Sequence, residues 1–308
     1  MKFNRLNDLY FKRLLGDKRR KNFTLNFLNA MLDRDENNYF MDITFLDKDN
    51  EPDTIDGKLS KLDIRADMND GTQIEIEVQV LPFKLMAERS LFYWSKMYAE
   101  QLNKSERYKK LKKTIAINLL NFDYLIGEKE WHNVYALLNT KSYRKLTDHM
   151  EIHFAEIPKF KLKDIRKMRA SETWMAYFSG NYDDKELEEL SMNKPIMKEV
   201  MDFERSFLMD KMQRREYEQR EKALRDYYSY MDETFEDGYD KGFDKGKIEG
   251  KMEGRVEGRK EGKMEGRKEG KIEGINEIAL RMLKRGKELA EIAEDTGLSI
   301  EEVKKLQA

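Results

Sequence analysis

The sequence contains no cysteine and only three histidines among its 308 residues. The lack of cysteine excludes disulfides, thiolate zinc sites and thiol catalysis. His132, His149 and His153 do not have the spacing of a metalloprotease motif, so we expect them to be structural or surface residues. No run of about 18 apolar residues occurs, so we expect no membrane span. The residues after Met1 lack the apolar core of a signal peptide, and we therefore expect a soluble, cytoplasmic protein.

An excess of charge of one sign is also missing. Lys and Arg number 59, Asp and Glu number 60, and the net charge is −1. Any contact with DNA must therefore depend on local basic patches rather than on the field of the whole chain. Charged residues nevertheless make up 39% of the sequence, well above the roughly 25% that is usual for a globular domain. This excess indicates extensive solvated helix surface.

The chain divides into four segments of different composition. Residues 1–160 contain nearly all of the strand-like sequence, and residues 161–237 are charged and helical. Residues 238–275 form a glycine repeat, and residues 276–308 form a short helical tail. In the first segment the order helix, three strands, helix, strand predicts a mixed α/β domain built in layers.

Hydrophobic periodicity predicts the individual elements of these segments. Helical spacing of apolar residues occurs in 6–15, 23–32 and 83–106, and the aromatic residues of the last are expected to pack on a sheet. Residues 184–245 are expected to form one or two helices, with Pro195 as a start or a kink. Strands are predicted in residues 39–45, 62–68, 74–80, 114–120 and 151–157.

Residues 62–80 are predicted to form a β-hairpin. Asn69-Asp70-Gly71 is the expected turn, because glycine adopts positive φ without a steric penalty. A loop of these three residues places Met68 opposite Thr72. That pairing fixes the register of both strands.

Counting back from this turn places Asp63 opposite Glu77, with Gln79 on the same side of the hairpin. Two carboxylates this close repel each other unless a cation lies between them. Mg²⁺ prefers oxygen ligands and commonly uses one or two carboxylates together with a substrate phosphate. We therefore interpret Asp63 and Glu77 as metal ligands, and Gln79 as an amide that orients water or the phosphate. The alternative interpretation is a solvated strand face on which Arg65 neutralises its acidic neighbours.

Asp63, followed by Glu77-Val78-Gln79, fits the D…(D/E)-x-K signature of PD-(D/E)XK nucleases. In several further segments the sequence resembles the Rpn family of recombination-promoting nucleases, or putative transposases, within that superfamily. The resemblance covers about residues 1–235. The segments that carry it are 8–16, 27–32, 62–66, 74–79 and 89–98.

The resemblance implies a restriction-endonuclease-like core, in which a mixed sheet is flanked by helices and Mg²⁺ or another divalent cation supports DNA cleavage. It implies a link to recombination or mobile-element transposition. Gln79 stands where the signature has lysine, which removes a cationic group that would help to activate water. Folds of this type often carry a further acid on the first helix, for which Asp8 and Asp17 are candidates. Arg89 is a candidate for contact with the phosphate backbone, and aromatic packing around it is the alternative.

Glycine recurs at every fourth residue from Gly238 to Gly274 in units of approximately basic-variable-Glu-Gly. A helix of this composition loses about 1 kcal/mol per glycine relative to alanine, and it places like charges four residues apart. Two outcomes therefore compete. The glycines let two helices approach closely, with right-handed winding because 4 exceeds 3.6, or the segment is a flexible charged linker.

Residues 276–308 resemble a small helix-turn-helix, with Gly297 in the turn and Ser299 as a helix cap. Glu301 and Glu302 suit a helix N-terminus but not DNA phosphates, so a helical cap or a protein contact is an equal alternative. We predict a nuclease core, a long helical arm and this helix-turn-helix-like tail, with a homo-oligomer formed through the C-terminal helical region. The alternative function is a non-catalytic, oligomerising interaction protein on a degenerate nuclease fold.

Overall fold

The computed structural model describes residues 3–46, 64–161 and 163–306. The chain forms two units, Met1–Arg225 and Asp226–Ala308. The first contains all strands that the structure describes, together with the helices that we expected as an extension after residue 160. The second begins within the longest helix and contains the C-terminal tail.

The first unit is built on a mixed six-stranded sheet with the order β1-β2-β3-β4-β6-β5. Strands β1, β2 and β3 pair antiparallel, β3, β4 and β6 pair parallel, and β5 is antiparallel to β6. The strands are β1 (Ile43–Phe45), β2 (Ile64–Met68), β3 (Gln73–Gln79), β4 (Thr114–Leu120), β5 (His132–Tyr135) and β6 (Met150–Glu156). The strands predicted at 74–80, 114–120 and 151–157 are confirmed, β1 is shorter than predicted, and β5 was not predicted.

The turn between β2 and β3 confirms the predicted register of the described residues. Gly71 has a φ of 84°, and the Met68 amide donates a hydrogen bond to the Thr72 carbonyl at 2.8 Å. Further from the turn, Ile64 lies opposite Ile76. Because the side chains of a strand alternate, this register decides which residues of both strands share a face.

One face of the sheet packs against the larger helical layer. This layer contains α1 (Asp8–Leu15), α2 (Lys21–Met31), α4 (Ala170–Ser179), α5 (Asp184–Asn193) and α6 (Pro195–Met209). Pro195 is the first residue of α6, as expected for a residue whose fixed φ suits a helix start. The apolar face of β3, including Ile74 and Ile76, is buried in the same cluster as Phe11 and Trp174. Short 3-10 helices lie at Lys18–Arg20, Tyr108–Lys110, Ile157–Lys159 and Ile165–Lys167.

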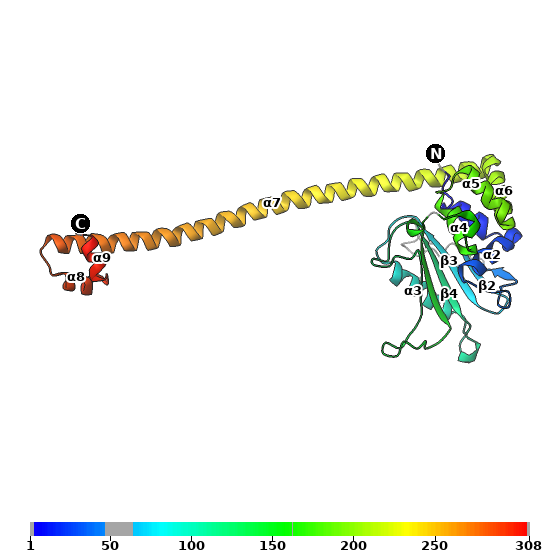
Figure 1. Cartoon of the computed structure of the whole chain (residues 1–308), viewed down its shortest axis with the longest axis horizontal. Coiled ribbons are helices and arrows are strands. Elements are labelled where there is room, and N and C mark those ends of the chain that lie inside the picture. Colours follow the sequence, from blue (N-terminus) through cyan, green and yellow to red (C-terminus); the bar gives the residue numbers. More distant parts are fainter. Residues whose placement is uncertain (1–2, 47–63, 162, 307–308) are drawn as a thin grey trace. The chain divides into compact units, whose positions relative to one another are not determined.

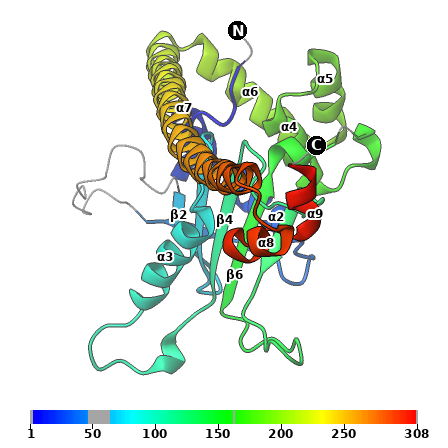
Figure 2. The ribbon, with the colours of Figure 1, turned by 90° about the vertical axis from the view of Figure 1, so that its left-hand side faces the viewer.

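The other face of the sheet packs against α3 (Met86–Ala99). Met86 and Trp94 of this helix form a second, smaller core with Phe154 of β6. Figures 1 and 2 show α3 and α4 on opposite sides of the strands. The sheet is therefore the middle layer of a restriction-endonuclease-like α/β sandwich.

A buried polar network joins the N-terminal residues to α1, α4 and α6. Arg5 donates hydrogen bonds to both carboxylate oxygens of Glu204, at 2.7 and 2.9 Å. The Tyr177 hydroxyl donates to Glu204 at 2.6 Å and lies 2.5 Å from the Tyr10 hydroxyl. Burial raises the pKa of both tyrosines, with the charge of Glu204 adding to the effect. The helical segment after residue 160 is thus fastened to the first helix of the chain.

The longest helix, α7 (Lys211–Lys284), runs without a break through the glycine repeat. All residues from Gly238 to Gly274 are exposed. A Cβ atom added at any glycine of the repeat would meet nothing within 4 Å. The segment is therefore helical in the structure without side chains of its own chain packed on the glycines.

The tail consists of α8 (Leu289–Thr296) and α9 (Ile300–Lys305), which pack beside the end of α7 (Figure 1). Ala279, Ile292 and Val303 form its small core. Gly297 ends α8 with a φ of 74°, and Ser299 caps α9 by accepting from the Glu302 amide. The predicted turn and cap are therefore present. Among the described helices, none combines the length and apolar character that a membrane crossing requires.

Candidate active site

Glu77 lies on β3 beneath α3, on the face of the sheet opposite the large core. Only 4% of Glu77 is exposed, and its neighbour on the same face, Glu75, is 2% exposed. The interpretation of this strand face as solvated surface is therefore wrong for both residues. The alternation of the strand correctly separates the two faces, but α3 buries the polar one, which strand periodicity alone does not reveal.

Arg89 of α3 forms an ion pair with Glu77. The side chains of Glu77 and Arg89 are 5% and 16% exposed, so the pair is largely shielded from water. The guanidinium carbon of Arg89 lies 5.8 Å from the centroid of the Phe83 ring and 5.5 Å from that of Tyr93. Arg89 was a weaker candidate from the sequence. The structure brings it into contact with the carboxylate of Glu77, one of the predicted metal ligands.

Gln79 follows Glu77 on the same face of β3 and is half-buried. Its amide nitrogen donates a hydrogen bond to the Leu81 carbonyl at 3.1 Å. Its backbone carbonyl accepts from the Asn121 amide at 3.0 Å, just beyond the end of β4. These contacts link the end of β3 to the residues that follow β3 and β4. The nitrogen of the Gln79 side-chain amide therefore faces the backbone.

Asn118 of β4 is a buried polar residue beside Glu77 that the sequence analysis did not single out. It pairs with Glu77 in the register of the two parallel strands. Its amide donates to the Ser90 hydroxyl at 2.9 Å and to the His153 carbonyl at 3.0 Å. A signal was present, because Asn118 is a polar residue inside an otherwise apolar run at the centre of β4.

Arg65 forms an ion pair outside its own hairpin. It lies opposite Glu75 in the β2–β3 register, and its guanidinium contacts Glu100, at the end of α3, at 2.7 Å. Two arginine–glutamate pairs, Arg65–Glu100 and Arg89–Glu77, therefore connect the sheet with the helix that covers it. The polar face of β3 thus carries charged side chains that are enclosed between the sheet and α3.

The acids on the first helices lie elsewhere. Asp8 is in the first turn of α1 and pairs with Arg220 at 3.5 Å. Asp17 caps a 3-10 helix and pairs with Arg19 and Arg20, and its hydrogen bonds with Arg19 hold its pKa well below the usual range. Neither residue shares a hydrogen bond or an ion pair with Glu77 in the part of the chain that the structure describes.

The described residues contain no group of three or more His, Asp or Glu side chains that could hold a metal ion. Asp63, the predicted second carboxylate, lies outside the described residues. The donors on β3 are the carboxylate of Glu77 and the amide of Gln79, and such oxygen ligands suit a hard divalent cation. The buried carboxylate of Glu77 is already balanced by the positive charge of Arg89. By donor type this position fits a cation, which would compete with Arg89 for the carboxylate of Glu77.

His132 and His153 lie together in the β5–β6 pair, and His149 lies apart from them, before the start of β6. Nε2 of His132 and Nδ1 of His153 are 3.0 Å apart, and His149 Nδ1 lies 2.9 Å from the Tyr98 hydroxyl. Burial lowers the pKa of His132 to about 4, and the neighbouring His153 adds to this effect. Burial alone would raise the pKa of Glu151, but contacts with His153 and Lys113 outweigh it and lower that pKa to about 2.

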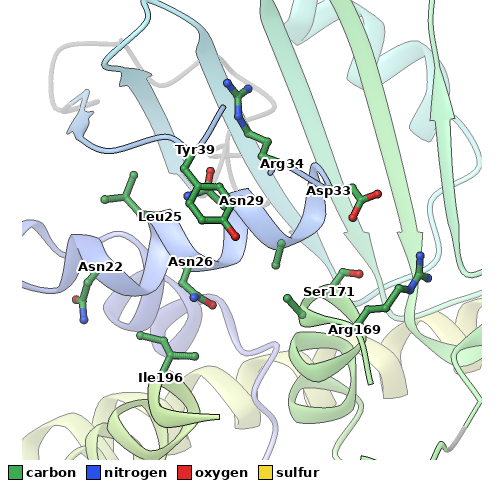
Figure 3. Close-up of a pocket in the computed structure, with 12 residues that line it drawn as sticks. Asn22, Leu25, Asn26, Asn29, Asp33, Arg34, Tyr39, Arg169, Ser171 and Ile196 are labelled. Atoms are coloured by element: carbon green, nitrogen blue, oxygen red, sulfur yellow. The ribbon is translucent and has the colours of Figure 1, made fainter. Parts of the chain in front are cut away.

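A hollow of about 550 Å³ lies on the opposite helical layer, between α2 and the starts of α4 and α6 (Figure 3). Two of its asparagines have partners within the protein. Asn26 accepts a hydrogen bond from the Trp174 indole at 3.0 Å, and Asn29 bonds both to the amide and to the carbonyl of Phe40. Because the hollow is not lined by the β3 acids, we do not assign it to the candidate active site.

Comparison with known proteins identifies the family of the chain. The model of one family, described as PD-(D/E)XK nuclease family transposase, matches residues 5–234. No curated protein and no solved structure matches the chain at a significant level. The matched range contains the whole sheet, α3 and both ion pairs of the polar layer. The chain belongs to the PD-(D/E)XK nuclease family of transposases.

Proposed function

We propose that this protein is a DNA endonuclease that depends on a divalent cation, Mg²⁺ by preference, and acts in recombination or transposition. The observation that carries the proposal is the buried Glu77–Arg89 pair beside Gln79 on β3, inside the range that matches the nuclease family. The carboxylate of Glu77 and the amide of Gln79, on one face of one strand, supply oxygen ligands of the kind that a hard divalent cation prefers.

Asp63 and Glu77 would hold the cation. When bound, such an ion lowers the pKa of a coordinated water and stabilises charge on the phosphate. The amide of Gln79 would orient the water or the scissile phosphate, although it cannot accept a proton as a general base. Arg89 would contact a phosphate of the DNA backbone, since its guanidinium matches phosphate geometry. Because Gln79 replaces lysine, the chain itself brings less positive charge to the water, and we expect slow cleavage.

The direct test is nicking of supercoiled plasmid DNA by the purified chain in MgCl₂. Glu77→Gln and Asp63→Ala should each reduce nicking at least 100-fold, and EDTA should abolish it. Asp148→Ala is the matched control, because this acid is 84% exposed and remote from β3 in sequence. Nicking that survives Asp63→Ala would remove the assigned site.

A second candidate function is supported by the surface of α7. Large apolar side chains stand at four-residue intervals near the start of the second unit and are between 36% and 73% exposed; they are Tyr227, Met231, Phe235, Tyr239 and Phe243. Exposed apolar rows of this size mark interaction surfaces. They support homo-oligomer formation through the C-terminal helical region. A chain that cleaves no DNA but self-associates would make the protein a non-catalytic interaction protein on a nuclease fold.

A further inference from the structure

The glycine repeat places four kinds of residue in four separate rows along α7. The basic row is Lys247, Lys251, Arg255, Arg259, Lys263, Arg267 and Lys271. The variable row is Ile248, Met252, Val256, Lys260, Met264, Lys268 and Ile272. The acidic row is Glu249, Glu253, Glu257, Glu261, Glu265, Glu269 and Glu273. The glycine row runs from Gly250 to Gly274.

The charges of the basic and acidic rows do not pair within their own helix. Opposite charges stabilise a helix when they are three or four residues apart, but members of these two rows are two or six residues apart. Residues four apart carry the same sign and repel. Between residues 250 and 276, all of which the structure describes, it records no ion pair, whereas Lys245 and Glu249, just before, are paired at 3.8 Å.

The variable row lies between the two charged rows. Each residue advances about 100° around a helix, so the basic row precedes the variable row by that angle and the acidic row follows it by the same angle. The glycine row lies on the far side. The five apolar members of the variable row are between 56% and 68% exposed. The helix therefore presents a row of five apolar residues and two lysines, which turns about 40° around the helix per four-residue unit. The row has a positive border on one side and a negative border on the other.

We infer that α7 pairs through the variable row with α7 of a second copy of this chain, with the two helices parallel and in register. This inference rests on the proposed self-association and is independent of the nuclease activity. Its contact row is one residue, about 100° around the helix, from the register of Tyr227 and Phe243. In a parallel pair related by a two-fold axis, the basic row of each helix lies beside the acidic row of the other. Each row then gains the opposite charges that its own helix does not supply.

An antiparallel pair through the same row has the reverse electrostatics. The two-fold axis is then perpendicular to the helices, and it brings the basic rows together on one side and the acidic rows together on the other. Like charges would face each other along the whole repeat. Charge complementarity therefore selects the parallel arrangement.

The variable row, rather than the glycine row, forms the contact because the helix is in water. Burial of apolar side chains drives association in water, and glycine has no side chain to bury. Close approach along glycines is most effective in a membrane, where no hydrophobic drive exists between helices. Because the row repeats every 4 residues rather than every 3.6, the paired helices wind around each other in a right-handed sense.

The orientation can be tested with introduced cysteines, because the chain has none of its own. Full-length Ile248→Cys and Ile272→Cys are oxidised separately and as an equimolar mixture. A parallel, in-register pair gives disulfide-linked dimers in each separate sample. Cross-links that form only in the mixture, joining position 248 to position 272, would overturn the parallel orientation. A monomeric mass of the unmodified full chain in sedimentation would overturn both the pairing and the self-association on which it rests.

The choice of row is tested by two matched sets of substitutions in the full chain, with helicity followed by circular dichroism. Gly254→Ala, Gly258→Ala and Gly262→Ala together should leave the dimer intact or tighten it at least threefold. Met252→Ser, Val256→Ser and Met264→Ser together should weaken it at least tenfold. Loss of the dimer in the alanine set with helicity retained would overturn the inference, as would a dimer of unchanged affinity in the serine set.

Discussion

Removal of the guanidinium of Arg89 provides a direct test of how the polar layer under α3 is stabilised. In Arg89→Met the side chain keeps much of its length but loses its charge, and the 5%-exposed carboxylate of Glu77 loses its ion-pair partner. Breaking a buried ion pair by removing one partner costs about 3–5 kcal/mol. For a unit of this size each kcal/mol corresponds to roughly 2–4 °C, so the melting temperature should fall by about 6–20 °C.

The two members of the pair should behave differently because they are buried to different extents. Arg89 is 16% exposed and its long side chain can extend toward solvent, so Glu77→Gln should cost less than about half of the loss seen in Arg89→Met. In the double variant no isolated charge remains under α3. Its stability should therefore lie close to that of Glu77→Gln alone, which makes the coupling energy equal in size to the loss in Arg89→Met, about 3–5 kcal/mol.

Urea denaturation followed by tryptophan fluorescence measures these differences, because Trp94 and Trp174 are buried in the cores on the two faces of the sheet. Arg166→Met is the control. It removes an arginine from a pair with Glu189 in which both side chains are exposed, and its effect should be small. The reasoning is refuted if Arg89→Met is no more destabilising than this control, or if adding Glu77→Gln recovers nothing.

Three further results are expected. Glu204→Gln should lower the unfolding free energy by about 3 kcal/mol, because it leaves the buried guanidinium of Arg5 without its carboxylate; Glu199→Gln on the same helix is the control, and equal urea midpoints would contradict the assignment. The pKa of His132 is about 4 in the folded chain and about 6.5 when unfolded, so the unfolded chain takes up the proton first. Unfolding free energy should therefore fall by up to about 3 kcal/mol between pH 6.5 and pH 4, and His132→Phe should remove that slope; an identical slope in the variant would disprove this. Saturating Mg²⁺ should raise the melting temperature of the wild type but not of Glu77→Gln, as expected when an ion binds only the folded site, and an equal rise in both would exclude Glu77 as a ligand.

The fold was predictable where local rules agree with tertiary packing. The Asn69-Asp70-Gly71 turn determined the register of the described part of the hairpin, because glycine at positive φ leaves one way to close it. β5 was missed because it is a short edge strand whose residues are half-buried or exposed on both sides, so it carries no clear alternation. Its place in the sheet comes from pairing with β6, a contact that no local pattern encodes.

The placement of Glu77 and Gln79 on the sheet was predictable, but their environment was not. Alternation placed Glu77 and Gln79 on one face of β3, which the structure confirms. That face is buried because α3 packs over it. The sequence places α3 after β3, but which face of the sheet α3 covers is decided by tertiary packing. The contact of Arg89 with Glu77 could not be derived for the same reason. Asp63 remains a prediction, since it lies outside the described residues.

No side chain of the described residues packs against the glycines of α7, and this affects how the length of the helix can vary. A deletion or duplication of one four-residue unit shortens or extends the helix by about 6 Å. It displaces no side chain from a core, because none packs on the repeat. Each remaining residue also keeps its own kind of neighbour four positions away, so charge and apolar patterns survive the change. Whole units can therefore be gained or lost without a change in the cores at either end of the helix.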